Sequence, residues 1–340
     1  MNELPPDFDG ELYRRTYTDL HGLGLDDLED HYWTFGVMEG RSGSSITNRA
    51  SFVALLDSTA SILEIGPLAS PAAIGPNVRY FDVLPTSALK EKAKLHGLDP
   101  DSCPSIDFVS ETADLSIVTT EFDAVVSSHA IEHQPDLVRH LNGVARILRP
   151  RGLYFLVVPD KRYCFDHFIA ESSIADVLGA SLRRRKLHNA VSVIRQLALT
   201  THNDAGRHWR GDHGEPLYKS SIDALRGAVQ SYLISSDTYI DAHAWHFTPE
   251  SFRGVLQTLF DLGVSPFKPV RVYHTVFGAI EFYAVLEKCT VQLRPLGEEL
   301  PHDFDAALYL AANPDVARSG MDAALHYLSY GRDENRKLRP

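Results

Sequence analysis

The chain has 340 residues, 44% hydrophobic and 23% charged, a composition typical of a soluble globular protein with a full hydrophobic core. Its formal charge of −12 argues against a nucleic-acid partner, because such interfaces neutralise phosphates with Lys and Arg. The first residues lack a signal-peptide pattern, and no apolar run reaches the ~20 residues that a membrane helix needs. We therefore expect a cytoplasmic protein with no integral membrane segment. Three widely spaced cysteines, Cys103, Cys164 and Cys289, predict reduced thiols rather than disulfides or a cysteine zinc site.

The two ends of the chain resemble each other in sequence. The first copy contains Phe8-Asp9, Leu12-Tyr13, Asp19, Gly24, His31-Tyr32, Gly36, Glu39 and Arg41. The second contains Phe304-Asp305, Leu308-Tyr309, Asp315, Gly320, His326-Tyr327, Gly331, Glu334 and Arg336, in the same order. A repeat of this length predicts two small helical units, residues 1–45 and 291–340, each with two short helices. They either pack on the rest of the protein or recruit a partner.

Between the repeats, apolar runs alternate with helical patterns, which predicts a parallel sheet covered by helices. We expect strands at 61–66, 78–83, 106–109, 122–127 and 153–159, and a closing strand pair at 270–277 and 280–287. Helices are expected at 47–56, 86–96 and 136–148, and another begins after Thr248. The first strand ends at Gly66 and the second near Asp82. Because ligands bind beyond the carboxyl ends of parallel strands, these two residues are predicted to share one crevice.

These segments resemble the class I S-adenosylmethionine (SAM) methyltransferases of the type 11-like group. The resemblance rests on Ser61-Ile62-Leu63-Glu64-Ile65-Gly66-Pro67, on the strand and loop from Glu121 to His133, and on Val144 to Pro159. It implies an α/β, Rossmann-like seven-stranded sheet over residues 46–290, with a helical insertion at about 160–246. One departure is the single glycine of Gly66-Pro67-Leu68-Ala69-Ser70-Pro71, where the family usually has G-x-G. The terminal repeats resemble those found beside bacterial polysaccharide glycosyltransferases, which implies polysaccharide-assembly proteins as candidate partners.

The resemblance also implies a set of cofactor-binding residues for SAM. These are Glu64, Gly66, Asp82, Glu111, Thr112, Ser128 and His129. Asp82 is expected to accept hydrogen bonds from the ribose hydroxyls, with a helix N-cap as the alternative. Glu64 is expected to order the turn or reach the methionine amino group, and otherwise to cap local amides. Glu111 and Thr112 lie where the family contacts adenine, and Asp114 is an alternative for that contact.

Histidines supply the candidate catalytic groups, because their pKa near ~6.5 suits a general base at neutral pH. His129 and His133 follow the fourth strand, and His208 and His213 lie in the insertion. His133 has the alternative of capping the next helix. Substrate-binding candidates are Asp160, Arg162, His208, Arg210, Asp212, His243 and His246. We expect no metal, because the spacing of these groups matches no metal motif, although a divalent ion remains an alternative.

The sequence therefore predicts a SAM-dependent methyltransferase that methylates an oxygen of a sugar in a bacterial surface polysaccharide or related glycan. Its acceptor would be a glycan or another small molecule. Two alternatives remain open. A nucleotide-dependent oxidoreductase or epimerase would require the G-x-G-x-x-G turn that this chain lacks. A noncatalytic binding module would keep the fold and use the repeats for recruitment.

Overall fold

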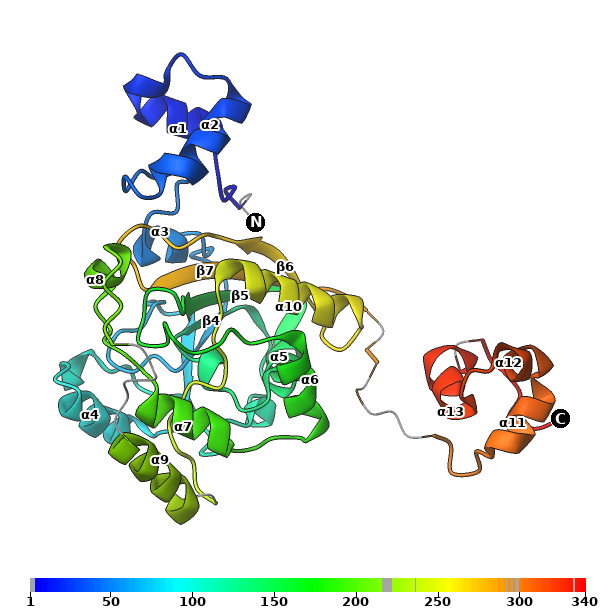
Figure 1. Ribbon diagram of the computed structural model, residues 1–340. Helices are drawn as coiled ribbons and strands as arrows, with labels where there is room; N and C mark the ends of the chain where they lie inside the picture. The colour runs from blue at the N-terminus through cyan, green and yellow to red at the C-terminus, as the bar shows by residue number, and fades with distance from the viewer. Residues whose placement is uncertain are drawn as a thin grey trace. The chain divides into compact units, whose positions relative to one another are not determined.

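The computed structural model describes residues 4–215, 222–235, 237–291, 293–294, 296, 300–332 and 334–340. The chain forms two compact units, Met1–Leu293 and Arg294–Pro340. The first unit contains the sheet and the N-terminal repeat. The second contains the C-terminal repeat. Each unit is described by itself below (Figure 1).

A seven-stranded mixed sheet forms the centre of the first unit. Its strands are β1 (Ile62–Ile65), β2 (Val78–Asp82), β3 (Phe108–Val109), β4 (Phe122–Ser128), β5 (Leu148–Pro159), β6 (Phe267–Val272) and β7 (Glu281–Lys288). Their order across the sheet is β3-β2-β1-β4-β5-β7-β6. The first five strands run parallel, whereas β7 is antiparallel to both β5 and β6. This order confirms the predicted Rossmann-like methyltransferase fold.

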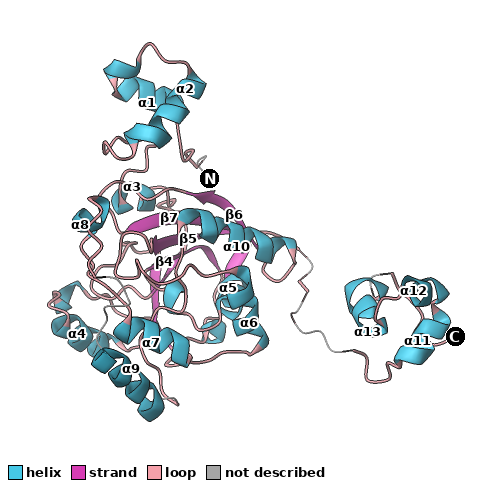
Figure 2. Ribbon diagram, in the orientation of Figure 1, coloured by secondary structure: helices cyan, strands magenta, loops and turns pink. Residues whose placement is uncertain are grey.

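The central strands are buried because helices cover both faces of the sheet, as Figure 2 shows. All four residues of β1 are buried, and so are the last eight residues of β5. Strands buried on both faces need continuous apolar runs, and Leu153 to Pro159 is one. The pairing of β5 begins earlier than predicted, at Leu148, which lies opposite Phe122 before a register shift in β4.

Helices precede the first strand and fill most of the connections between the strands, and several carry side-chain N-caps. Those of the first unit are α1 (Gly10–Thr16), α2 (Leu25–His31), α3 (Arg49–Val53), α4 (Thr86–Leu95), α5 (Leu137–Ile147), α6 (Ile174–Leu182), α7 (Ala190–Ala198), α8 (Ala205–Trp209), α9 (Ile222–Ser235) and α10 (Pro249–Asp261). The Asp136 side chain caps α5 by accepting from Arg139 N at 3.0 Å. Thr248 caps α10, which begins with Pro249 and packs along β6 (Figure 1).

The closing strand pair is antiparallel as predicted, but β6 lies three residues earlier than expected and ends at Val272. Pro269 is accommodated because β6 is an edge strand, where one missing N–H donor is tolerated. The strand does not continue through His274, because the main-chain N and Nδ1 of this residue both donate to Asp7 Oδ1, at 2.8 and 2.7 Å. Tyr32 of the N-terminal repeat also hydrogen-bonds the His274 ring. These contacts attach the repeat to the end of β6.

The N-terminal repeat is organised around a buried tyrosine. The Tyr13 hydroxyl lies 3.1 Å from His31 Nδ1, and Gly36 packs against it. Arg41 forms ion pairs with Asp19 at 2.8 Å and with Glu39. The N-terminal repeat therefore combines a buried aromatic core with ion pairs near its surface.

The C-terminal repeat has the same organisation. It contains α11 (Ala306–Ala312), α12 (Pro314–Ser319) and α13 (Ala323–His326). The Tyr309 hydroxyl lies 2.9 Å from His326 Nδ1 beside Gly331, and Arg336 pairs with Asp315 at 2.8 Å. Both repeats also end in a π-helical turn, at 32–36 and 327–331. Each has more helical turns than the two helices that were predicted.

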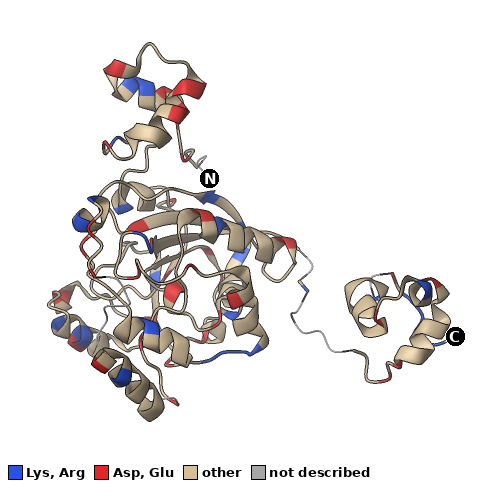
Figure 3. Ribbon diagram, viewed as in Figure 1, with Lys and Arg blue, Asp and Glu red and all other residues tan. Residues whose placement is uncertain are grey.

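Charged side chains are spread over many elements of the chain (Figure 3). The basic run from Arg183 to Lys186 forms the loop between α6 and α7. Within the described residues, every helix is too short or too polar to span a bilayer.

Candidate functional site

The carboxyl ends of three neighbouring strands bring the predicted cofactor residues together. Gly66 follows β1, Asp82 ends β2 and Ser128 ends β4. Ile65 pairs with Phe81 on one side and with Ser127 on the other, so Gly66 lies between Asp82 and Ser128. The Gly66 amide donates to Phe81 O at 2.9 Å. The structure therefore brings Gly66 and Asp82 to the same edge of the sheet, as the sequence predicted, and places Ser128 beside them.

The backbone at Gly66 is shaped for close approach. Its φ of +71° is in the left-handed region that favours glycine. A Cβ at this position would meet only the Ala130 Cβ within 4 Å, at 3.6 Å, so the position is strained for other residues but not crowded.

Glu64 lies inside the same edge and is fully buried. Its two carboxylate oxygens accept from Ala72 N at 2.7 Å and from Ala73 N at 2.9 Å. Burial raises the pKa of Glu64 to about 7, although both amides and Arg49 favour the charged form. Glu64 thus caps two amides of the loop after β1, as the structural alternative supposed, and by doing so also orders that loop. A contact from it to the cofactor stays a prediction.

Asp82 and Ser128 are polar groups that this edge holds largely out of water. Asp82 is 8% exposed, its Oδ1 accepts from Leu84 N at 2.9 Å, and burial raises its pKa. It is not the N-cap of α4, because that position belongs to Pro85. The Ser128 hydroxyl is buried without a hydrogen-bond partner among the described residues. A hydroxylated cofactor would satisfy such groups, so the residues present fit SAM.

The loop after β3 holds the predicted adenine contacts. Glu111 and Thr112 are exposed there, and Ser110 N donates to Asp82 O at 3.1 Å, which keeps this loop beside Asp82. Asp114 instead caps the next 3-10 turn by accepting from Ser116 N at 2.9 Å. Adenine binding by this loop stays a prediction.

His129 begins the loop after β4 in a left-handed conformation, with φ of +49°. Its Nε2 lies 2.7 Å from Glu281 Oε2, and Arg49 Nε donates to Glu281 Oε1 at 3.0 Å. Burial alone would raise the pKa of Glu281, but the hydrogen bonds from His129 and Arg49 lower it to about 2. A carboxylate therefore orients the His129 ring, an arrangement found in general bases.

A second group of histidines and carboxylates lies just beyond His129 along the chain. His133 Nδ1 is 2.9 Å from Asp241 Oδ1, and His243 Nδ1 is 2.6 Å from Asp166 Oδ2. Both rings direct Nε2 toward Glu132 Oε1, at 3.8 and 3.9 Å. His133 does not cap α5, since Asp136 does. We name the residues Glu132, His133 and His243 the inner cluster.

His246 extends this group, with its Nε2 3.6 Å from Asp166 Oδ1. Burial lowers the pKa of His246 to about 4. Glu132, Asp166 and Glu281 were not among the predicted site residues. They come from three distant segments, and only the fold brings them together. The one sequence signal was the position of Glu132 in the loop after the fourth strand.

His208 and His213 belong to a separate group around α8. The His208 Nδ1 lies 3.0 Å from His213 Nδ1, and its Nε2 lies 3.0 Å from His202 O. His167 stacks on His213 with ring centroids 3.7 Å apart. Burial lowers the pKa of both His208 and His213. Both His208 nitrogens already have partners, and a catalytic role for these histidines stays a prediction.

The remaining predicted substrate residues differ in exposure. Asp160 is fully buried rather than at a crevice mouth, because it accepts from Arg162 Nη2 at 2.6 Å and from Thr275 Oγ1 at 2.5 Å. Arg210 is exposed, and Asp212 pairs with Arg207 at 2.7 Å. Acceptor binding by these residues is untested.

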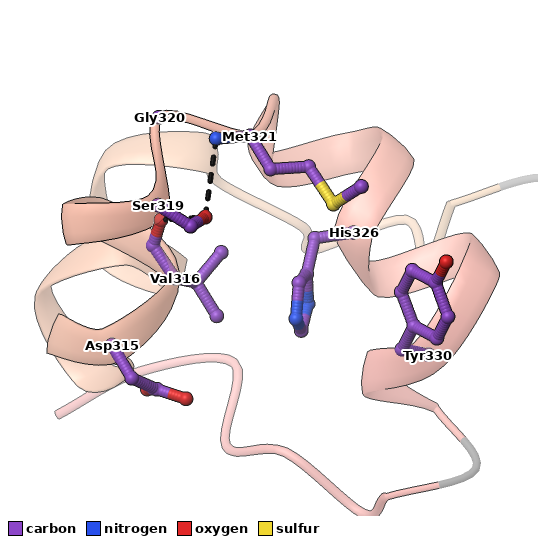
Figure 4. Close-up of a pocket in the computed structure, with 7 residues that line it drawn as sticks. All are labelled: Asp315, Val316, Ser319, Gly320, Met321, His326 and Tyr330. Atoms are coloured by element: carbon purple, nitrogen blue, oxygen red, sulfur yellow. Dashed lines mark hydrogen bonds between the residues drawn. The ribbon is translucent and has the colours of Figure 1, made fainter.

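The C-terminal unit contains a hollow of its own. It opens between α12 and α13 and is lined by residues that include Asp315, Val316, Met321, His326 and Tyr330 (Figure 4). Its lining residues, Asp315 to Tyr330, include none from the strand ends.

Comparison with known proteins identifies the central segment. Residues 66–156 match the family model described as a methyltransferase domain. An 89-residue segment is also 37% identical to ubiquinone biosynthesis O-methyltransferases of Xanthomonas oryzae pv. oryzae, covering 26% of this chain and 36% of each relative. The matched segment therefore spans only about a third, 36%, of the length of each of these curated relatives.

Solved structures of methyltransferases are also similar to the chain. Mitomycin 7-O-methyltransferase MmcR has 13% identity and a TM-score of 0.35, covering 79% of this chain and 61% of that one. The CcbJ methyltransferase from Streptomyces caelestis has 11% identity and a TM-score of 0.38, covering 71% and 94%. No assignment rests on these two similarities. The family match supports the predicted methyltransferase domain, whereas the likeness of the repeats to those beside glycosyltransferases stays a prediction.

Proposed function

We propose that this protein is a SAM-dependent methyltransferase that transfers a methyl group to an oxygen atom of its acceptor. The observation that carries the proposal is the convergence of Gly66, Asp82 and Ser128 at adjacent strand ends, inside the segment that matches a methyltransferase domain. SAM supplies a methyl group already activated on a sulfonium. The chain's own residues then have to align the acceptor and remove its proton.

His129 is the residue we propose for proton removal. Its ring is oriented by Glu281 through Nε2, so Nδ1 is the nitrogen left to accept a proton. The ring is 30% exposed and follows Ser128 directly, which places it at the edge that we assign to the cofactor. A Glu281–His129 pair held by Arg49 would keep the base in one orientation.

The acceptor is proposed to be a hydroxyl-bearing molecule, with a sugar of a bacterial surface polysaccharide or related glycan as the specific candidate. Support for oxygen as the methylated atom comes from the 37% identity to O-methyltransferases over 89 residues. The histidines and carboxylates of the insertion suit the recognition of hydroxyl groups. The proposal of a glycan acceptor rests on the resemblance of the terminal repeats to those beside polysaccharide glycosyltransferases. We propose that these repeats contact polysaccharide-assembly proteins.

Calorimetric titration with SAM, and separately with NAD, tests the cofactor. We expect SAM to bind and NAD not to bind; NAD binding without SAM binding would reject the proposal. Asp82→Ala should weaken SAM binding about 10- to 150-fold, which corresponds to the ~1.5–3 kcal/mol of hydrogen bonds to a charged group. Asp57→Ala is the matched control, because Asp57 is exposed and bonds only Thr59 in its own loop.

Methyl transfer from labelled SAM to a panel of glycans and other hydroxylated small molecules tests the acceptor. Label on a sugar oxygen would support the glycan proposal. Transfer confined to non-sugar hydroxyls would support the proposal of O-methylation but reject a glycan as the acceptor. SAM binding with no transfer to any member of the panel would favour the noncatalytic alternative.

A further inference from the structure

We propose that Glu132, His133 and His243 form a binding site for a divalent transition-metal ion, with zinc as the best match. The three side chains come from the turn after β4 and from the segment that precedes α10. One ligand atom from each lies within 4.8 Å of the others. Two imidazoles and one carboxylate are a common ligand set of catalytic zinc, which keeps a further position open.

The spacing of the inner cluster suits an ion better than direct hydrogen bonds. Glu132 Oε1 is 3.8 Å from His133 Nε2 and 3.9 Å from His243 Nε2, and both separations exceed a hydrogen bond. Since the third separation is at most 4.8 Å, a point equidistant from the three atoms lies no more than about 2.5 Å from each, compared with the 2.0–2.2 Å of zinc bonds to N and O. A small inward movement would complete the coordination.

Among the described residues, no hydrogen bond accounts for the burial of the Glu132 carboxylate. It is 1% exposed, and neither of its oxygens has a hydrogen-bond partner among the described residues. A buried carboxylate without hydrogen bonds is costly, because water no longer stabilises its charge. A cation between Glu132 and the two imidazoles would remove this cost.

The outer nitrogens of both histidines are already held by carboxylates. Asp241 Oδ1 lies 2.9 Å from His133 Nδ1, and Asp166 Oδ2 is hydrogen-bonded to His243 Nδ1 at 2.6 Å. Such carboxylate–histidine pairs fix the tautomer and direct the other nitrogen toward a metal. Here each Nε2 faces Glu132, so both rings present the atom that a metal would bind.

The main chain fixes the two halves of the site relative to each other. Ala244 N and Trp245 N both donate to Glu132 O, at 2.7 and 3.3 Å. The Trp245 ring adds a bond from Nε1 to Gln134 O at 2.7 Å. His243 therefore approaches Glu132 through a rigid connection. His133 is the most exposed of the three side chains, at 26% compared with 6% for His243 and 1% for Glu132.

The role of the ion rests on the proposed function, whereas its binding does not. His129 Nδ1 lies 3.7 Å from Glu132 Oε1, so the proposed base and the metal would face the same acceptor oxygen. A bound metal lowers the pKa of a coordinated hydroxyl or water. It would therefore ease deprotonation of the acceptor next to the methyl donor.

Binding is tested on the full chain after treatment with a chelator and without SAM. We expect one Zn²⁺ per chain by calorimetry, visible absorption bands on titration with Co²⁺, and a higher thermal midpoint with zinc. Glu132→Gln keeps the shape of the side chain and should weaken zinc binding at least 10-fold while removing the thermal shift. Asp166→Asn, which acts through His243, should weaken binding about 10- to 100-fold.

His208→Gln is the matched control, since His208 lies in the other histidine group whose nitrogens come within 4.8 Å of one another. It should bind zinc like the wild type. Absence of stoichiometric zinc binding, or binding unchanged in Glu132→Gln, would overturn the site. Loss in His208→Gln with retention in Glu132→Gln would overturn it as well. SAM binding by zinc-free protein separates these outcomes from failure of the proposed function.

Discussion

The buried His140 makes a quantitative prediction about stability in acid. It is 7% exposed on α5, its Nε2 lies 2.9 Å from the Tyr154 hydroxyl, and that hydroxyl lies 2.8 Å from Ser127 Oγ. Burial, with a smaller contribution from the charge of Arg139, lowers the pKa of His140 from 6.5 to about 4. The folded protein therefore resists protonation of a ring that the unfolded chain protonates readily.

The sign of the effect follows from this difference in pKa. Between pH 6.5 and 4 the unfolded state binds more protons than the folded state, so stability falls as the pH falls. The contribution of His140 is fully present above pH 6.5 and is lost toward pH 4. Between pH 7.5 and pH 4 the loss amounts to about 3 kcal/mol for pKa values of 6.5 and 4.

His140→Leu removes the titrating ring while Tyr154 keeps its bond with Ser127. Urea unfolding at a series of pH values, followed by tryptophan fluorescence, measures the free energy of unfolding of the first unit. That unit contains all three tryptophans of the chain. The wild type should lose about 3 kcal/mol more than the variant between pH 7.5 and 4. Burial also lowers the pKa values of His188 and His246 to about 4. Both residues are present in the wild type and in the variant, so their contributions to the pH dependence cancel in the comparison.

Parallel curves of stability against pH for the two proteins would refute this reasoning. The ring would then be protonated in the folded state as easily as in the unfolded chain. Absolute stability at pH 7.5 is a separate matter, because the substitution also removes one hydrogen bond worth about 1 kcal/mol.

Two further predictions concern packing and an ion pair. Gly331→Ala would place a Cβ over the Tyr309 hydroxyl and should destabilise the C-terminal unit by about 1–3 kcal/mol. We expect a lower thermal midpoint when unfolding is followed by the near-UV circular dichroism of tyrosine. The unfolding transition followed by tryptophan fluorescence should be unchanged. Gly254→Ala is its control, since a Cβ there meets no atom within 4 Å; an equal loss in both variants would contradict the overlap. Arg49→Met leaves Glu281 buried with less compensation and should cost about 1–3 kcal/mol in urea unfolding. A cost below about 0.5 kcal/mol would show that the pair behaves like an exposed one.

The sequence alone determined the sheet and the edge at which its strand ends bring polar residues together. Apolar runs that end in glycine or an acidic residue identify buried strands, and parallel strands place their carboxyl ends together. Gly66, Asp82 and Ser128 were therefore predictable as neighbours. The internal repeat was visible for the same reason, because residues such as Tyr13 and Tyr309 keep their spacing.

The tertiary structure alone decided the pairing of the polar groups. Glu132, Asp166 and Asp241 are far apart in the chain, and no local pattern indicates that they surround the same two imidazoles. Their contacts depend on how the insertion folds back over the turn after β4, which is fixed by hydrogen bonds such as Ala244 N to Glu132 O. Local sequence sets strand and helix formation through short-range periodicity, whereas such long-range contacts depend on packing. For that reason the sequence located the edge where Gly66, Asp82 and Ser128 meet but not the inner cluster.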